Sequence, residues 1–267
     1  MFLGVSTDGH FIERDILMNS SANTFGLSGS TLKLIACVCM MIDHIGHHLF
    51  PQYDLLRVIG RIAFPIFAFL IAEGCRYTRN RLRYFLTIFV SGLLFFGVTY
   101  AFSGMVFYNV FLNFSIAIPC VYLLGYFKRL IFSGDLNAAS IVGLSFAYLL
   151  VLCAAYVTFE FLPIEYGFFG MMIPLLVSAT HLREYTDGAA VKYIDNHLIR
   201  VITTAILLLP LHLTGRFSLQ IFAVLSIPFL IFYNGKVGSR RLKYFFYAFY
   251  PAHIVLILAV KELFFKS

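Results

Sequence analysis

Long apolar runs separated by short polar segments fill almost the whole chain after about residue 30. Within the runs, polar and apolar positions do not alternate with a period of two, as a membrane β-strand would require. Most runs approach the roughly 20 residues that an α-helix needs to cross a bilayer. They predict nine membrane-spanning helices, at 32–50, 56–75, 83–102, 105–125, 140–160, 165–182, 197–214, 217–233 and 243–263. The sixth, seventh and eighth are short, so eight or ten helices also fit the pattern.

The composition supports this interpretation. Of the 267 residues, 60% are hydrophobic and 12% are charged, whereas a soluble domain carries about 25% charged residues. This excludes a soluble enzyme, a nucleic-acid-binding domain and a disordered protein. We predict an all-α, polytopic transmembrane helix bundle in one domain at 31–267, after a polar and mobile N-terminal tail at 1–30. The five cysteines contain no CxxC pair, which favours small buried apolar side chains and predicts no metal site.

The positive charges predict the orientation in the membrane. If the N-terminus is cytoplasmic, the cytoplasmic segments hold 14 of the 20 Lys and Arg residues and the external segments hold four. This distribution follows the positive-inside rule. With nine spans, the C-terminus and the acidic segment 160–165 are then external. We expect no cleavable signal peptide, because the first apolar run begins near Leu32. The expected location is a bacterial cytoplasmic membrane.

Ionisable residues inside spans are costly and indicate functional sites. The first predicted span contains Asp43, His44, His47 and His48, in which Asp43–His47 and His44–His48 are each four residues apart on one helical face. A carboxylate beside an imidazole can fix its tautomer, as a general base requires. The alternative for His47 and His48 is a solvated position at the membrane interface.

The second predicted span contains Arg57 and Arg61. Arg57 can extend to the interface, but Arg61 lies deeper and needs a carboxylate or a ligand. Asp43 is the nearest intramembrane candidate in the sequence, so we predict a coupled Asp43–Arg61 pair. Gly60 permits close approach of another helix, and Pro65 can kink its own helix.

Polar residues in other spans fall at a similar depth. At about 1.5 Å of rise per residue, they lie between the midplane and the outer half of a core about 30 Å thick. This predicts a water-accessible polar chamber, although amides in spans also simply bond neighbouring helices. The layer comprises Asp43, His44, Arg61, Asn109, Asn113, His212 and His253.

Several uncommon strings of residues occur in one order along these spans. They are Leu32–Ala36, Met41–Gly46, Gly60–Phe69, Glu73-Gly74, Tyr77–Asn80, Asn109–Phe111, Tyr166–Gly170, Tyr233–Gly235 and Tyr247–His253. Between about residues 31 and 258 the chain therefore resembles the TraX family, named for the conjugative-transfer protein that acetylates the pilin N-terminus. That family is distantly similar to the lysosomal heparan glucosaminide acetyltransferases, which move an acetyl group across a membrane.

The resemblance implies an acetyltransferase that uses acetyl-CoA as co-substrate. Its acceptor would be an amine or hydroxyl, for example a pilin N-terminus or a glycan. Such a reaction needs a base and a donor to the oxyanion. His44 is the expected base and Asp43 its orienting partner, and His253 is a second candidate base. Arg61 would hold the thioester carbonyl or neutralise Asp43.

The remaining expected contacts concern the two substrates. Asn109, Asn113 and Tyr166 are candidate substrate-binding residues, and Asn109 is an alternative holder of the thioester carbonyl. For the CoA phosphates the cationic loops offer Arg79, Arg81, Arg83 and Lys243. Ordinary positive-inside charge explains those loops equally well. The other function class is a transporter or channel with an intramembrane polar site, which the absence of evident repeated halves disfavours.

Overall fold

The computed structural model describes residues 25–104, 109–162, 164–213 and 218–264. Within these ranges the protein is helical, with a parallel bridge between Leu27 and Tyr233. The elements are α2 (Gly29–His48), α3 (Asp54–Gly60), α4 (Ala63–Tyr77), α5 (Arg81–Ser103), α6 (Val110–Phe132), α7 (Ala138–Phe161), α8 (Gly167–Ala179), α9 (Val191–Ile194), α10 (His197–Leu213), the 3-10 helix η1 (Ser218–Ser226), α11 (Ile227–Ile231), η2 (Arg240–Leu242) and α12 (Lys243–Phe264). Most of the predicted tail, residues 1–24, lies outside the described ranges.

The prediction of an all-helical, multi-pass membrane protein is confirmed. Five helical stretches in the described ranges are long and apolar enough to cross a membrane: α2, the α3–α4 pair, α5, α6 and α7. Shorter apolar helices cover 167–179, 197–211 and 219–231. The outward surface of α7 is apolar, with Val142, Phe146 and Leu149 exposed. Lipid is the natural neighbour of such a surface, since a soluble protein would place polar side chains there.

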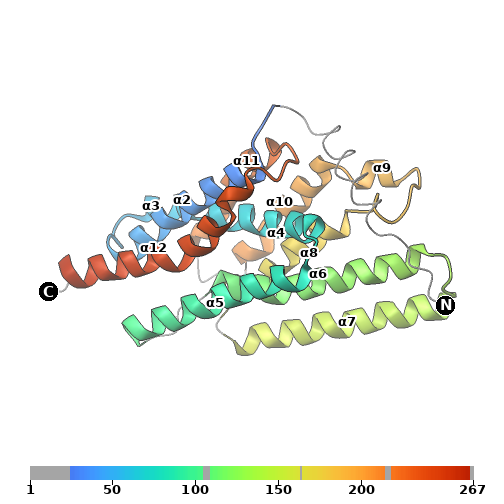
Figure 1. Ribbon diagram of the computed structural model, residues 1–267, viewed down its shortest axis with the longest axis horizontal. Helices are drawn as coiled ribbons and strands as arrows, with labels where there is room; N and C mark the ends of the chain where they lie inside the picture. Colours follow the sequence, from blue (N-terminus) through green and yellow to red (C-terminus); the bar gives the residue numbers. More distant parts are fainter. Residues whose placement is uncertain (1–24, 105–108, 163, 214–217, 265–267) are drawn as a thin grey trace.

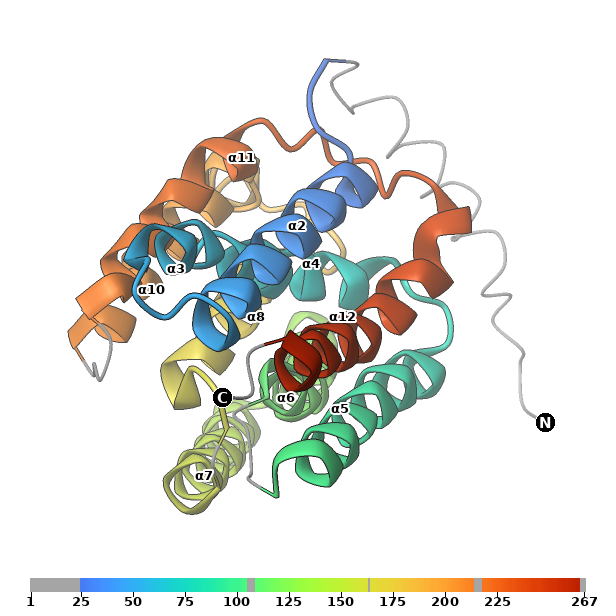
Figure 2. The same cartoon turned by 90° about the vertical axis from the view of Figure 1, so that its left-hand side faces the viewer.

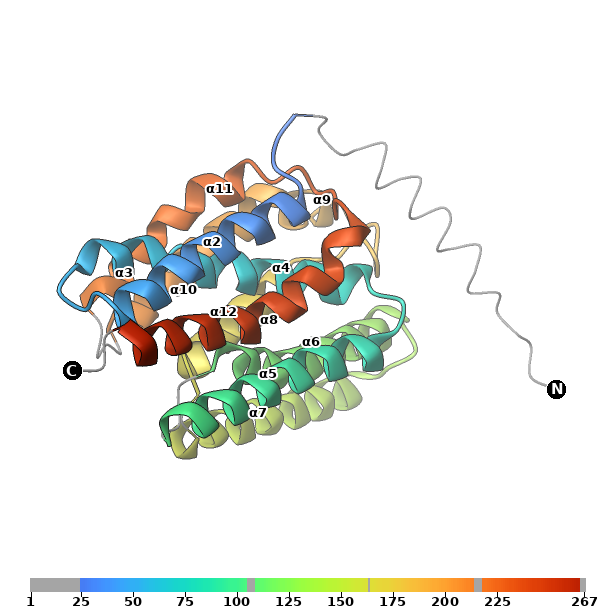
Figure 3. The same cartoon turned by 60° about the vertical axis from the view of Figure 1, so that its left-hand side comes forward.

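The helices form two groups that meet along α8 and α12. Helices α5, α6 and α7 run side by side on one side of the molecule, and α2, α4, α10 and α11 lie on the other (Figure 1; Figure 3). Helix α12 packs against both α2 and α5, and α8 contacts α4, α6 and α10 (Figure 2). The centre between the groups is filled by fully buried apolar side chains, including Ile66, Phe69, Ile118, Met171 and Ile173.

The second predicted span is broken into α3 and α4. The break at Arg61 and Ile62 precedes Pro65, which occupies the first turn of α4, where a missing backbone N–H costs nothing. Gly60, the last residue of α3, packs directly against α2. A Cβ atom at this position would overlap the side chain of Asp43 on α2. The predicted close approach at Gly60 is therefore confirmed.

The fourth predicted span, 105–125, ends seven residues before the end of the helix that the structure shows in this region. Helix α6 runs from Val110 to Phe132, and its start is set by Asn109, whose side-chain oxygen accepts a hydrogen bond from the Phe111 N–H at 2.9 Å. Cys37, Cys39, Cys75 and Cys120 are buried as expected, whereas Cys153 on α7 is exposed; all five are free thiols.

Candidate functional site

The contact between α2 and α3 joins the two charged clusters of the first spans. Nη2 of Arg61 donates to both carboxylate oxygens of Asp43, at 2.7 and 2.8 Å. Nε of Arg57 donates to Oδ1 of the same carboxylate at 3.3 Å. The guanidinium of Arg61 is buried, with 3% of its side chain exposed. Asp43 and Arg61 are thus the pair expected from the sequence, with Arg57 as a second cation.

The side chains that pair with Asp43 are arginines, whereas the sequence also suggested a histidine. Among the described residues Asp43 makes no hydrogen bond to His44 or His47, and Nδ1 of His47 lies 3.1 Å from Nη1 of Arg57. Because a guanidinium has only donors, that nitrogen of His47 accepts. The expected role of Asp43 as the orienting partner of His44 therefore has no contact to support it. Asp43 instead neutralises two arginines.

His44 meets a histidine from the last helix. Its ring centroid lies 5.0 Å from that of His253 on α12, with the planes tilted by 55°. Nδ1 of His253 donates to the Phe249 carbonyl at 2.8 Å, and its Nε2 is buried without a partner. In the neutral ring this Nε2 carries the lone pair, because the other nitrogen holds the proton. Two segments more than 200 residues apart thus bring two imidazoles together.

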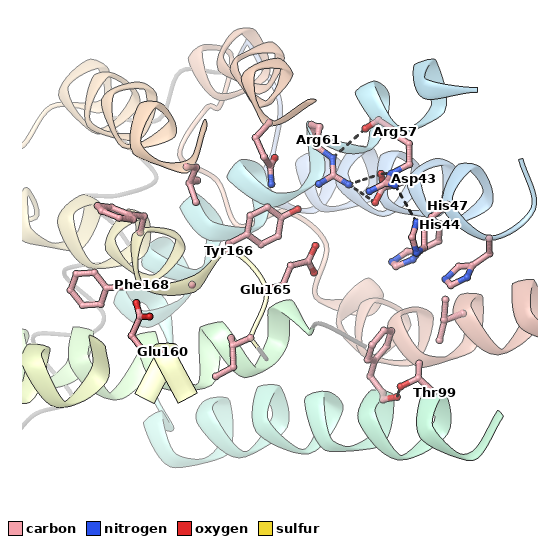
Figure 4. Close-up of a pocket in the computed structure, with 18 of the residues that line it drawn as sticks. Asp43, His44, His47, Arg57, Arg61, Thr99, Glu160, Glu165, Tyr166 and Phe168 are labelled. Carbon is pink, nitrogen blue, oxygen red and sulfur yellow. Dashed lines mark hydrogen bonds and ion pairs between the residues drawn. The ribbon is translucent and has the colours of Figure 1, made fainter. Parts of the chain in front are cut away.

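The charged cluster and His44 border a cavity of about 500 Å³ at one end of the bundle. Asp43, His44, Arg57 and Arg61 line one side (Figure 4). Glu165 and Tyr166 point into it from the opposite side (Figure 4). Other lining groups are Thr99, Tyr156, Glu160, Phe168, Phe169 and Gln220. Of the residues predicted to form a polar chamber, Asp43, His44 and Arg61 line this cavity, whereas His253 contacts His44 but is not among the lining residues.

The connection that carries Glu165 and Tyr166 is fixed by hydrogen bonds from helix α6. Nδ2 of the fully buried Asn113 donates to the carbonyls of Glu165 and Gly167, at 2.9 and 2.8 Å. Tyr166 has a positive φ of 63°, which is rare for a residue with a side chain. Its ring is stacked on that of Phe64 at 3.6 Å between centroids. These contacts keep a strained backbone in place.

The two asparagines therefore act on the backbone. Asn109 caps α6 and donates through Nδ2 to the Gly92 carbonyl on α5 at 2.7 Å. Neither Asn109 nor Asn113 is among the described residues that line the cavity. Direct contact between them and a substrate in this cavity is unsupported, as is a role for Asn109 at a thioester carbonyl. Tyr166 does line the cavity.

Glu165 is an ionisable residue of the cavity lining that the sequence did not indicate as part of the site. It was assigned to an external acidic segment, but its carboxyl group faces Arg61 and Asp43 across the cavity (Figure 4). It lies in the connection between α7 and α8, and burial raises the pKa of its carboxyl to about 7. The only signal in the sequence was its position next to the Tyr166–Gly170 string. A carboxyl group that titrates near neutrality can donate or accept a proton.

The expected CoA-binding residues are divided between several places. Arg79 and Arg81 line a second cavity at the opposite end of the bundle. Arg83 is exposed in the first turn of α5 and is not among the residues lining that cavity. The side chains of Lys243 and His212 lie outside the part of the chain that the structure describes.

Comparison with known proteins gives one family and two relatives. The profile of a family described as "TraX protein" matches residues 28–261. "Probable fimbrial assembly protein FimC, serogroup H1" from Dichelobacter nodosus is 28% identical over 257 residues, which cover 88% of this chain and 96% of that protein. "Uncharacterized protein RP591" from Rickettsia prowazekii (strain Madrid E) is 53% identical over 38 residues, 14% of this chain and 15% of that protein. No solved structure matches.

Proposed function

This chain belongs to the TraX family, and we propose that it is an integral-membrane acetyltransferase that moves an acetyl group from cytosolic acetyl-CoA to an amine or hydroxyl acceptor at or beyond the membrane. The observation that carries the proposal is the convergence of His44, Arg61 and Glu165 on one cavity in a protein of this family. The fimbrial name of one relative favours a pilus or fimbria subunit over a glycan as the acceptor.

The proposed topology has nine crossings with a cytoplasmic N-terminus in a bacterial cytoplasmic membrane. The crossings are α2, α3–α4, α5, α6, α7, α8, α10, η1–α11 and α12. Successive crossings run in opposite directions, so the end of α2, the start of α3 and the connection between α7 and α8 share the external side. These segments build the first cavity. The positive-inside distribution supports the same orientation.

In this reaction the acceptor nitrogen or oxygen bonds to the acetyl carbon, the carbon–sulfur bond of acetyl-CoA breaks, and CoA leaves as a thiolate. The attacking amine or hydroxyl gives up a proton in the same process and therefore requires a proton acceptor. We assign this role to His44, which lines the cavity and contacts His253. The lone pair on Nε2 of His253 is held toward the interior by the bond from its Nδ1 to a backbone carbonyl. An amine that arrives as an ammonium group must first lose a proton. Glu165, on the opposite side of the cavity, is positioned to bind the ammonium group and accept that proton.

Arg61 is the candidate donor to the oxyanion. Its Nη2 is used by Asp43 and its Nε donates to the Arg57 carbonyl at 3.3 Å, whereas Nη1 has no partner among the described residues. A buried guanidinium whose position is already fixed costs little reorganisation when charge develops on a nearby oxygen. Asp43 keeps this cation in place as its counter-ion.

A transporter is the second candidate, favoured by the interruption between α3 and α4 at the charged cluster. Transporters commonly place ion or substrate sites at broken helices. The two candidates differ in chemistry, since a transporter leaves acetyl-CoA intact.

The test uses the full chain purified in detergent and supplied with acetyl-labelled acetyl-CoA. We expect release of free CoA and transfer of label to a peptide with a free N-terminus, and less transfer to the same peptide with a blocked N-terminus. The same protein, denatured by heat, is the control for non-enzymatic transfer. If neither CoA release nor labelling of protein or peptide exceeds that control, the acetyltransferase proposal fails.

A further inference from the structure

A second cavity, of about 350 Å³, lies at the other end of the bundle from the first. Arg61 lies at the break just before α4 and Arg76 lies near the end of α4, so a rise of about 1.5 Å per residue separates them by roughly 22 Å. The fully buried Ile66 and Phe69 lie between them. The second cavity is therefore separate from the proposed catalytic site, and the charge distribution places it on the cytosolic side.

The lining of the second cavity is strongly cationic. It contains five basic side chains and one carboxylate: Arg76, Arg79, Arg81, Lys128, Arg129 and Glu184. Positive-inside charge explains an excess of cations in loops, but not their convergence around a hollow. A concave, low-dielectric surface of one sign concentrates counter-ions of the other.

Two of these cations are already engaged in holding the fold. Nζ of Lys128 donates to the carbonyls of Ser178, Ala179 and His181, at 2.7, 2.9 and 3.2 Å, and so caps the C-terminal end of α8. Nε of Arg76 donates to Oε1 of Glu184 at 2.8 Å. The single carboxylate of the lining is thus used by Arg76.

Arg81 and Arg129 supply positive charge that no described carboxylate neutralises. Both are exposed, and the Arg81 guanidinium lies 5.2 Å from the centroid of the Tyr122 ring, which orients it. Arg81 is also the first residue of α5, whose N-terminal end adds positive potential. Arginine presents paired donors that match the oxygens of a phosphate.

A buried hydroxyl group completes the site. Ser178 is 8% exposed and lines the cavity, and its Oγ has no hydrogen-bond partner in the described structure. An unsatisfied buried hydroxyl costs free energy that a ligand oxygen would recover. The same residue, Ser178, accepts a hydrogen bond from Nζ of Lys128 through its backbone carbonyl.

We propose that this cavity binds the phosphate group of an anionic ligand that reaches it from the cytosolic side, through Arg81, Arg129 and the Ser178 hydroxyl. Two sources carry such a group: a soluble phosphorylated nucleotide such as CoA, and an anionic phospholipid headgroup. The site does not require that the protein transfers acetyl groups, because binding alone defines it.

The experiment compares two double variants of the full chain in nanodiscs. Arg81→Gln with Arg129→Gln removes the two unneutralised cations, and Lys192→Gln with Arg241→Gln removes two exposed cations outside the cavity lining. CoA without an acetyl group is titrated into nanodiscs of phosphatidylcholine, and lipid retained by each protein is measured after purification from membranes containing phosphatidylglycerol. Elution as a single species in size-exclusion chromatography checks folding.

We expect the cavity variant to bind one of these two ligands about tenfold or more weakly than the control variant does, since each lost charged contact lowers the affinity roughly tenfold. Loss confined to CoA identifies a soluble nucleotide, and loss confined to phosphatidylglycerol identifies a lipid. Ser178→Ala, which retains all charges, should weaken the same ligand several-fold. The proposal is overturned if wild-type protein binds neither ligand, or if the cavity and control variants bind both equally. CoA binding without acetyl transfer would count against the proposed activity and leave this site standing.

Discussion

Nη2 of Arg61 and the carboxylate of Asp43 form a two-point contact between the end of one helix and the break in the next, at 2.7 and 2.8 Å. Breaking a buried pair by removing one partner leaves a buried charge uncompensated, whereas removing both leaves only Arg57, whose side chain is 21% exposed. This asymmetry makes the contact testable.

Asp43→Asn and Arg61→Gln should each lower the yield of folded protein, and combining them should recover part of that loss. Loss of one partner of a buried pair typically costs about 3–5 kcal/mol. Fluorescence-detected size-exclusion chromatography of the three variants measures the folded fraction. Additive losses in the double variant would show that the pair contributes no coupling.

His44→Gln should abolish acetyl transfer while leaving membrane insertion unchanged. Glutamine keeps the size and polarity but cannot act as a base near pH 7, and loss of a general base typically lowers the rate about 10²–10⁴-fold. His48→Gln, one turn further along α2, is the control and should retain most activity. If His44→Gln works at a normal rate while His253→Gln is inactive, the base lies on α12.

Glu165→Gln should remove a pH dependence near neutrality. Burial raises the pKa of Glu165 to about 7 in the folded protein, so the folded state binds more protons than the unfolded state between about pH 4.5 and 7. Its contribution to stability is therefore largest at low pH and falls as the pH rises through that window. We therefore expect the melting temperature of Glu165→Gln, minus that of the wild-type protein, to increase as the pH rises. An unchanged difference from pH 5 to 8 would contradict the raised pKa.

Gly60→Ala should disrupt the site through the backbone. Its Cβ would overlap the Asp43 side chain, so α2 and α3 must separate and the Arg61–Asp43 contact must lengthen. The control is Gly143→Ala on α7, where nothing lies within 4 Å of the added carbon and a helical Gly→Ala change stabilises by about 0.5–1 kcal/mol. Opposite shifts in the apparent melting temperature are expected. Equal shifts would mean that α2 and α3 pack less tightly than described.

Single cysteines test the proposed orientation. Arg79→Cys and Leu162→Cys, each placed in a chain without the five native cysteines, should react with a membrane-impermeant maleimide from opposite sides of the membrane. Arg79 borders the cationic cavity and Leu162 the end of α7. Labelling from the same side would refute the nine-crossing topology and the assignment of the two cavities to opposite faces.

The sequence determined the class of this protein, because apolar run length and charge content decide whether a chain can be dissolved by water or by lipid. It also indicated the Asp43–Arg61 pair, since a guanidinium inside a membrane needs a partner and few carboxylates compete. The length of an apolar run does not determine where a helix begins: the start of α6 depends on the Asn109 cap.

Only the tertiary structure decided which polar residues share a cavity and what each contacts. His253 reaches His44 because α12 packs against α2, a contact between segments that no local pattern specifies. Glu165, whose sequence context suggested an external loop, turns into the cavity because Asn113 binds the backbone on either side of Tyr166. Hydrophobicity is a property of each residue and survives in the linear sequence, whereas hydrogen-bond partners and charge neighbours depend on which helix surfaces meet.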